Sequence, residues 1–192
     1  MLRFLTLRRR PFARFARDEK GSVITEAVLV LPIMLWAVFA LFTLWDSFRS
    51  VNVVQKASYT VSDAISREMN PVSMTYLTGL RDTMDYMLDN DQDVRMRITS
   101  VTWSEARNRF EVAWSRSPGN AIPQLTTSTL QAFAPRIPTM SDGDFAMLVE
   151  TEVDHTPVFR VGLMADQTFR EFIVTRPRFV PKICLTGTIC IM

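Results

Sequence analysis

The sequence predicts an α+β protein, in which a long N-terminal transmembrane helix extends into a small extracytoplasmic domain with an antiparallel sheet. Three observations predict this class. An uncharged apolar run covers residues 27–45, helical periodicity continues beyond it to residue 70, and period-two alternation of apolar residues starts at Val94. The expected divisions are a basic leader at 1–21, a membrane span at 22–45, an extension of the same helix at 46–70 and an α+β domain at 71–192.

The membrane span is predicted from length and composition. The run that begins at Ala27 and ends at Trp45 has 19 residues and no charge, close to the roughly 20 residues that a helix needs to cross a hydrocarbon core about 30 Å thick. Pro32 falls inside this run, and membrane helices tolerate an internal proline. No Ala-x-Ala site follows Trp45, so a cleaved secretory signal is not expected. The lipid bilayer is therefore the first predicted partner.

The distribution of charge predicts the topology. The whole chain carries a net charge of +2, but residues 1–21 hold seven basic and two acidic side chains, and residues 46–192 hold 15 basic and 17 acidic ones. Positive charge that flanks a span stays in the cytoplasm. The expected location is a bacterial inner membrane, with the N-terminus in the cytoplasm and the C-terminal domain in the periplasm.

The same basic segment has two weaker interpretations, as a nucleic-acid interface or as a mitochondrial transit peptide. A topology signal explains the arginines without a nucleic acid, because the span follows them directly. Asp18 and Glu19 stand against a transit peptide, since such peptides are poor in acidic residues. No nucleic-acid partner is predicted.

The first helix is expected to continue past the membrane and to end at Asn70-Pro71. Residues 47–70 contain no glycine or proline. Apolar and small residues recur there at steps of three and four, on one helical face: Phe48, Val51, Val54, Ala57, Ser58, Val61, Ala64, Ile65 and Met69. A second helix is expected within 71–91, with a methionine- and leucine-rich core face.

Three acidic residues after the second helix raise the question of calcium. Asp89, Asp91 and Asp93 alternate as calcium ligands can. A loop of the EF-hand type would also need glycine where Val94 stands and glutamate where Ser100 stands. A solvated turn is the expectation, and no metal or cofactor is predicted.

Four strands are expected after residue 93. The alternation of Val94, Met96 and Ile98 shifts before Val101, and a turn at 105–108 leads to a second strand. That strand places Phe110, Val112 and Trp114 on one face. A loop at 117–123, a short helix at 125–133, a turn at 141–144, a strand that ends near Pro157 and a last strand at 168–175 complete the order.

Catalysis is not expected. His155 is the only histidine and stands beside Pro157, where no nucleophile pairs with it. No phosphate-binding glycine loop or nucleophile elbow is found. The chain is therefore predicted not to be an enzyme.

Both cysteines stand near the C-terminus, on the side of the membrane that is predicted to be oxidising. An even pair in such a compartment favours a disulfide between Cys184 and Cys190 over free thiols. Their spacing is not that of a zinc site, and no further cysteine or histidine completes one. The closed loop is short, so its stabilising effect would be modest and local.

Glu26 needs an explanation, because it is the acid at the mouth of the span and the fifth residue after Gly21. If the chain were cut after Gly21, Ser22 would carry a cationic amine. In a staggered pair of subunits, Glu26 of one could then meet the amine of the next, and the pair would be tolerable in a low dielectric. The helix dipole also favours an anion near a helix N-terminus. The alternative is that Glu26 lies in the interfacial zone and reaches water.

These residues resemble the processing site of type IV pilin-like precursors. With the run "VLVLP" that ends at Pro32, they resemble more narrowly the TadE-like (TadE/TadF) pseudopilins of tight-adherence (Flp) pilus systems. Gly143-Asp144, Thr156-Pro157 and Arg176-Pro177-Arg178 are similar to later steps in that family, so the resemblance covers most of residues 21–178.

The resemblance implies a pilin-like fold and a place in a pilus. It implies cleavage between Gly21 and Ser22 by a prepilin peptidase, the role of pilin-type glutamate for Glu26, and partners among other TadE/TadF-like pseudopilins and the Flp pilus machinery. The expected function is that of a minor pseudopilin in adhesion and secretion. The alternative is an uncleaved single-span envelope protein whose periplasmic domain binds a partner or ligand.

Overall fold

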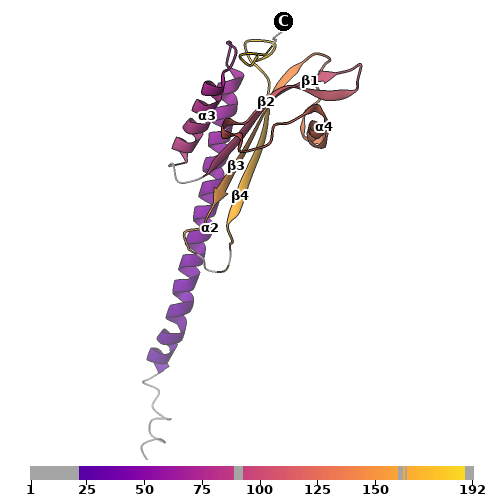
Figure 1. Ribbon diagram of the computed structural model, residues 1–192. Helices are drawn as coiled ribbons and strands as arrows, with labels where there is room; N and C mark the ends of the chain where they lie inside the picture. Colours follow the sequence, from indigo (N-terminus) through magenta and orange to yellow (C-terminus); the bar gives the residue numbers. More distant parts are fainter. Residues whose placement is uncertain (1–21, 89–92, 160–161, 163, 189–192) are drawn as a thin grey trace, which may run out of the picture.

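A single long helix dominates the computed structural model, which describes residues 22–88, 93–159, 162 and 164–188. Helix α2 (Ser22–Ser66) is 45 residues long and continuous through Pro32. Its N-terminal part projects from the domain, and its second half lies along a sheet (Figure 1). The predicted α+β class, a long apolar helix followed by a small antiparallel sheet, is confirmed.

The sheet has four strands, each antiparallel to its neighbours, in the order β2–β1–β3–β4. The elements after α2 are α3 (Met74–Met87), β1 (Val94–Ser104), β2 (Arg109–Arg116), η2 (Pro118–Asn120), α4 (Thr127–Leu130), η3 (Gln131–Arg136), β3 (Phe145–His155) and β4 (Gln167–Thr175). Their order is the predicted one. The short helix is divided, because α4 passes at Gln131 into the 3-10 turns of η3.

Helix α2 ends at Ser66 and not at the predicted Asn70. The amides of Arg67 and Glu68 donate to carbonyls three residues back, which tightens the last turn in 3-10 fashion. The amide of Arg178 then donates to the carbonyl of Ser66 at 2.8 Å. A distant segment thus satisfies a terminal carbonyl of the helix, and no local pattern could have indicated that stop.

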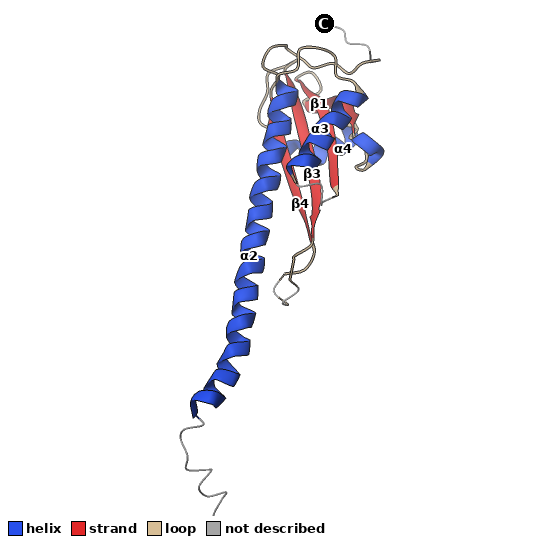
Figure 2. Ribbon diagram, turned by 90° about the vertical axis from the view of Figure 1, so that its left-hand side faces the viewer, coloured by secondary structure: helices blue, strands red, loops and turns tan. Residues whose placement is uncertain are grey.

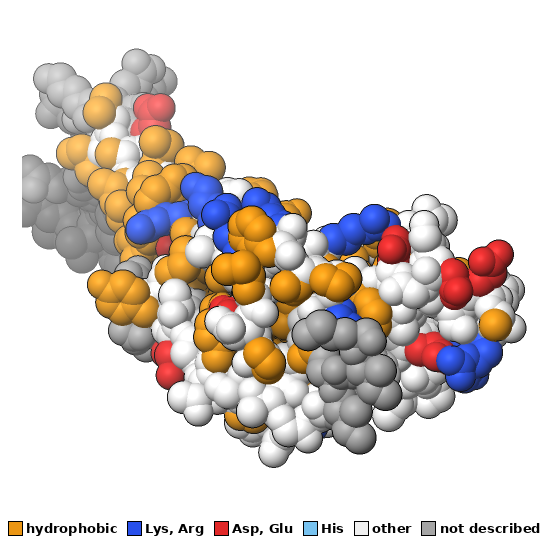
Figure 3. All heavy atoms as spheres, turned by 90° about the horizontal axis from the view of Figure 1, so that it is seen from above, with side chains coloured by type: hydrophobic (Ala, Val, Ile, Leu, Met, Phe, Trp, Pro, Cys, Tyr) orange, Lys and Arg blue, Asp and Glu red, His pale blue; other side chains and the backbone are white. Residues whose placement is uncertain are grey.

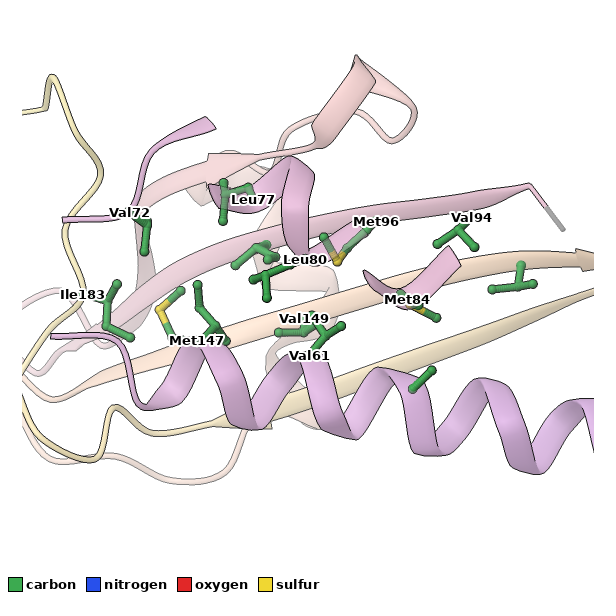
Figure 4. Close-up of a cluster of buried hydrophobic side chains, with 14 of the residues drawn as sticks. Val61, Val72, Leu77, Leu80, Met84, Val94, Met96, Met147, Val149 and Ile183 are labelled. Atoms are coloured by element: carbon green, nitrogen blue, oxygen red, sulfur yellow. The ribbon is translucent and has the colours of Figure 1, made fainter. Parts of the chain in front are cut away.

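The face of the sheet toward α2 and α3 carries the larger core (Figure 2). Val61 of α2, Leu80 of α3 and Val149 of β3 converge there, all 9% exposed or less (Figure 4). The buried members of this first cluster are Val54, Ala57, Val61, Ile65, Val72, Leu77, Leu80, Met84, Leu88, Val94, Met96, Ile98, Trp114, Met147, Val149, Val153, Ile183 and Leu185. The predicted helical faces are confirmed in their centres, whereas Phe48 and Met69 at their ends are exposed.

The opposite face of the sheet carries a second, smaller cluster under α4 and η3. Its buried members are Val101, Phe110, Leu125, Leu130, Ile137, Ala146 and Leu148. A strand covered on both faces reads as a nearly continuous apolar run, and β3 is of this kind. The change of pattern that the sequence shows before Val101 marks the point where β1 begins to contribute to the second cluster.

The predicted common face for Phe110, Val112 and Trp114 is wrong. Ser100 of β1 pairs with Trp114, but the next residue, Val101, pairs with Val112. Ala113 is therefore the extra residue of a β-bulge, and a bulge reverses the alternation of the strand that contains it. As a result Phe110 lies in the second cluster and Trp114 in the first.

Ion pairs cover the outer face of the sheet beyond the second cluster. Arg97 of β1 lies opposite Glu150 of β3, and its guanidinium donates two bonds to the carboxylate, at 2.6 and 2.7 Å. Arg95 pairs with Glu152 at 3.1 Å and with Asp154 at 2.8 Å. The arginines that alternate along β1 are thus neutralised by β3 and do not form a free basic patch.

The C-terminal segment closes the core at the end remote from the N-terminus. Val72 and Leu185 form a parallel bridge, in which the amide of Val72 donates to the carbonyl of Cys184 at 2.8 Å. The indole N–H of Trp114 donates to the carbonyl of Ile183, also at 2.8 Å. Residues 183–185 therefore belong to the core of the domain.

Candidate functional site

The exposed segment of α2, residues 23–39, is the most unusual surface of the protein. Its large apolar side chains are open to the surroundings, with Val23 72%, Leu29 68% and Ile33 66% exposed. Figure 3 shows apolar side chains covering this distant part of the helix. The helix is long and apolar enough to cross a membrane. An apolar surface of this extent points to contact with lipid or with other proteins.

Glu26 is the one charge on this segment. Its side chain is exposed and lies in the second turn, since the first turn of α2 contains no acidic residue. The dipole effect is concentrated in the first turn, so it favours this carboxylate less than the sequence alone predicted. Ser22 begins α2, and Gly21 lies outside the described residues.

The spacing between Ser22 and Glu26 has a geometric consequence. Four residues of α-helix rise about 6 Å and complete slightly more than one turn. The backbone nitrogen of Ser22 and the carboxylate of Glu26 therefore lie on one side of the helix, about one turn apart. A parallel neighbour shifted by about one turn would bring the two groups to the same level.

The predicted span is not open along its whole length. Ala27, Pro32 and Trp45 are exposed, but Ala40 and Thr43 are 6% and 1% exposed. Part of the cover is the described start of the segment between β3 and β4, residues 156–159, which we call the β3–β4 loop. The Thr43 hydroxyl lies 2.8 Å from the carbonyl of Phe39 and 3.4 Å from that of Phe159.

Aromatic side chains hold this loop against the helix. The ring of Phe159 lies 5.0 Å from that of Phe39 and 5.6 Å from that of Phe42, between ring centroids. Phe42 in turn lies 5.9 Å from Trp45. The guanidinium of Arg49 stands 5.8 Å from the Trp45 ring, a cation–π arrangement. The apolar surface of α2 is thus continuous with the loop.

A charged group meets the only histidine just beyond this contact. The Asp46 carboxylate lies 3.9 Å from Nε2 of His155, and the imidazole stacks on Phe169 at 5.3 Å. His155 is the last residue of β3 and is 6% exposed, so it is a buried strand residue. Its Nε2 has no hydrogen-bond partner among the described residues. It packs α2 against β4, and no described nucleophile adjoins it.

The cysteine and calcium predictions fall partly outside the described residues. Cys184 is disulfide-bonded, and Cys190 is not among the described residues. Asp89 and Asp91 also lie outside them, and Asp93 precedes β1. Within the described part of the chain, no group of three or more His, Cys, Asp or Glu side chains could hold a metal ion.

Glu26 and the apolar helix were predicted from the sequence, whereas the contact of the β3–β4 loop with the helix was not. Pro157, Val158 and Phe159 are an apolar group at a predicted turn, which was the available signal. No protein family, no curated protein and no solved structure matches this chain.

Proposed function

We propose that this chain is a minor pseudopilin of the TadE-like type, a structural component required to assemble a Flp adhesive pilus. The observation that carries the proposal is the exposed apolar segment 23–39 with Glu26 as its single charge. The same helix continues without a break into the core of an antiparallel domain. Such a helix fits a subunit that is anchored in the bilayer before assembly and packs beside other apolar helices in the assembled pilus.

The proposed sequence of events follows from the charges of the chain. The basic residues of 1–21 hold the N-terminus in the cytoplasm of a bacterium, and the domain lies in the periplasm. A prepilin peptidase cuts after Gly21 and leaves the amine of Ser22 at the membrane surface. Glu26 then pairs with the amine of a neighbouring TadE/TadF-like subunit that is shifted by about one turn. An unpaired charge would oppose this packing, and a paired one favours the staggered register.

The first test is the N-terminal sequence of the protein extracted from the membrane of its native host. The proposal predicts a mature chain that starts at Ser22, and a Gly21→Ala variant that remains full length. A wild-type chain that starts at Met1, in cells that contain an active prepilin peptidase, would contradict it. The protein would then be an uncleaved single-span envelope protein whose periplasmic domain binds a partner or ligand.

A second test separates cleavage from assembly. The Glu26→Gln variant should still be cut after Gly21 but should leave the Ser22 amine unpaired among apolar helices. Loss of one partner of a desolvated pair costs about 3–5 kcal/mol, so co-purification with pilus components should fall roughly a hundredfold or more. The measurement is the amount of mature protein in the assembled fraction relative to the membrane fraction.

The matched control is Val30→Gln, which places the same amide one turn further along the exposed segment without removing a charge. Its assembly should fall much less than that of Glu26→Gln. Equal assembly of Glu26→Gln and the wild type would show that the carboxylate merely reaches water.

A further inference from the structure

We propose that the β3–β4 loop is a second membrane contact, in which Val158 and Phe159 enter the interfacial layer of the bilayer beside α2. The inference rests on the proposed function only in requiring that α2 spans a membrane. The occupant of this surface is lipid, and the loop would hold the domain at two points instead of one.

The loop reaches far along α2 toward its exposed apolar segment. Phe159 packs on Phe39, whereas Asp46 is the first charged residue after the uncharged run. Phe39 lies seven positions before Asp46, a rise of about 10 Å along a helix. The loop therefore reaches almost two turns past the first charge, alongside helix residues that the sequence assigns to the span. In Figure 1 the ends of β3 and β4 that this segment joins lie beside the middle of α2.

The apolar side chains of the loop are exposed. Val158 is 63% exposed and Phe159 is 37% exposed, although both are apolar. Phe159 adjoins Phe42, which in turn adjoins Trp45, and these two side chains are 44% and 57% exposed. Tryptophan beside a basic residue is typical of the membrane–water interface, and Trp45 with Arg49 has this arrangement. The surface of the loop is thus continuous with the lipid-facing surface of the helix.

Small residues of the helix lie at and near the position where Phe159 contacts it. Ala40, Thr43 and Ser47 are small and buried, whereas Leu41 on another side is 67% exposed. Small residues allow the loop backbone to approach closely. The hydroxyl of Thr43 donates to the carbonyl of Phe39 at 2.8 Å and lies 3.4 Å from that of Phe159, so the loop backbone passes close to the helix.

The polar groups nearby limit how far the loop enters. Irregular backbone does not lie exposed in the hydrocarbon core, because its N–H and C=O groups would lack partners. The Asp46–His155 contact lies at the end of β3, immediately before the loop. The loop is therefore interfacial, with its apolar side chains in lipid and β3 outside.

The test uses an environment-sensitive fluorophore on single added cysteines in the full chain, reconstituted in phosphatidylcholine vesicles with spin-labelled lipids as quenchers. Val158→Cys should show blue-shifted emission and strong quenching by a spin label near the headgroups. Leu29→Cys, in the exposed segment of α2, reports insertion of the helix. Ser141→Cys is the matched exposed control at the other end of β3. The chain without an added cysteine, labelled in parallel, measures the background.

The outcomes separate the two proposals. Quenching at positions 29 and 158 but not at 141 supports the loop contact. Quenching at 29 alone overturns the loop contact and leaves the spanning helix intact. No quenching at 29 overturns the membrane span, and with it this inference. Equal quenching at 141 and 158 also overturns it, because the whole domain would then lie on the lipid. Val158→Asp should retain the wild-type circular dichroism spectrum and reduce quenching of a label at the exposed Thr156→Cys.

Discussion

Replacement of Glu150 by alanine is expected to destabilise the domain by about 3–5 kcal/mol, because it leaves a buried guanidinium without its counter-charge. The side chains of Arg97 and Glu150 are only 9% and 11% exposed. Arg97 also donates to the carbonyl of Pro123, so the pair ties β1, β3 and the segment before α4 together. Chemical denaturation of the full chain in detergent, followed by the fluorescence of its tryptophans, measures the loss.

Two further variants identify the origin of that loss. The double variant Arg97→Met/Glu150→Met removes both charges and keeps the volume, so its stability should return to the wild-type value or exceed it. Arg107→Ala breaks an exposed pair with Glu111, in which Arg107 is 61% exposed, and should change stability by less than about 1 kcal/mol. An effect of Glu150→Ala no larger than that of Arg107→Ala would mean that the buried pair is screened by water.

Local patterns predicted most of the fold. The long helix, the second helix and the four strands each have a periodicity that spans enough residues to be recognised. The turn at 105–108 and the start of the last two strands follow from short polar signals. A periodicity can be read from neighbouring residues alone, even where the strand pairs with a distant one, as Val94 does with Val153.

Non-local contacts account for the errors. The extra residue at Ala113 reverses the alternation of β2. Both faces of the sheet are covered, so an apolar side chain is accepted on either face and the pattern gives no sign of the change. The last carbonyl of α2 accepts from the amide of Arg178, more than a hundred residues away. Residues 183–185 complete the core, although they read only as a short tail.

Of the candidate site, the helix with Glu26 was predictable from the sequence and the loop beside it was not. Glu26 stands out because a charge beside an uncharged run is rare, and its exposure agrees with a position at an interface. The β3–β4 loop was not predictable, because its contact with Phe39 joins residues 120 positions apart. Only its position beside the helix, and not its local sequence, distinguishes this loop from an ordinary turn.

Substitution of Val61 by aspartate is expected to separate α2 from the sheet. Val61 is 1% exposed and faces Val149 and Leu80 in the first cluster (Figure 4). An aspartate there must either stay charged without a partner or take up a proton, and the cost is at least about 3 kcal/mol. Domains of this size are commonly stable by only about 5–15 kcal/mol. Amide hydrogen exchange in β3 and β4 should therefore accelerate strongly.

Thr60→Asp provides the matched control, since it introduces the same side chain one residue earlier on the exposed side of α2. Its effect on stability should stay within about 0.5 kcal/mol. If Val61→Asp and Thr60→Asp behaved alike, the packing of α2 on the sheet would not hold the domain. The expected difference would instead mean that the second half of α2 holds the domain together through its buried face. Because the same unbroken helix carries the exposed apolar segment, a displacement of that segment along the helix axis would act directly on the core.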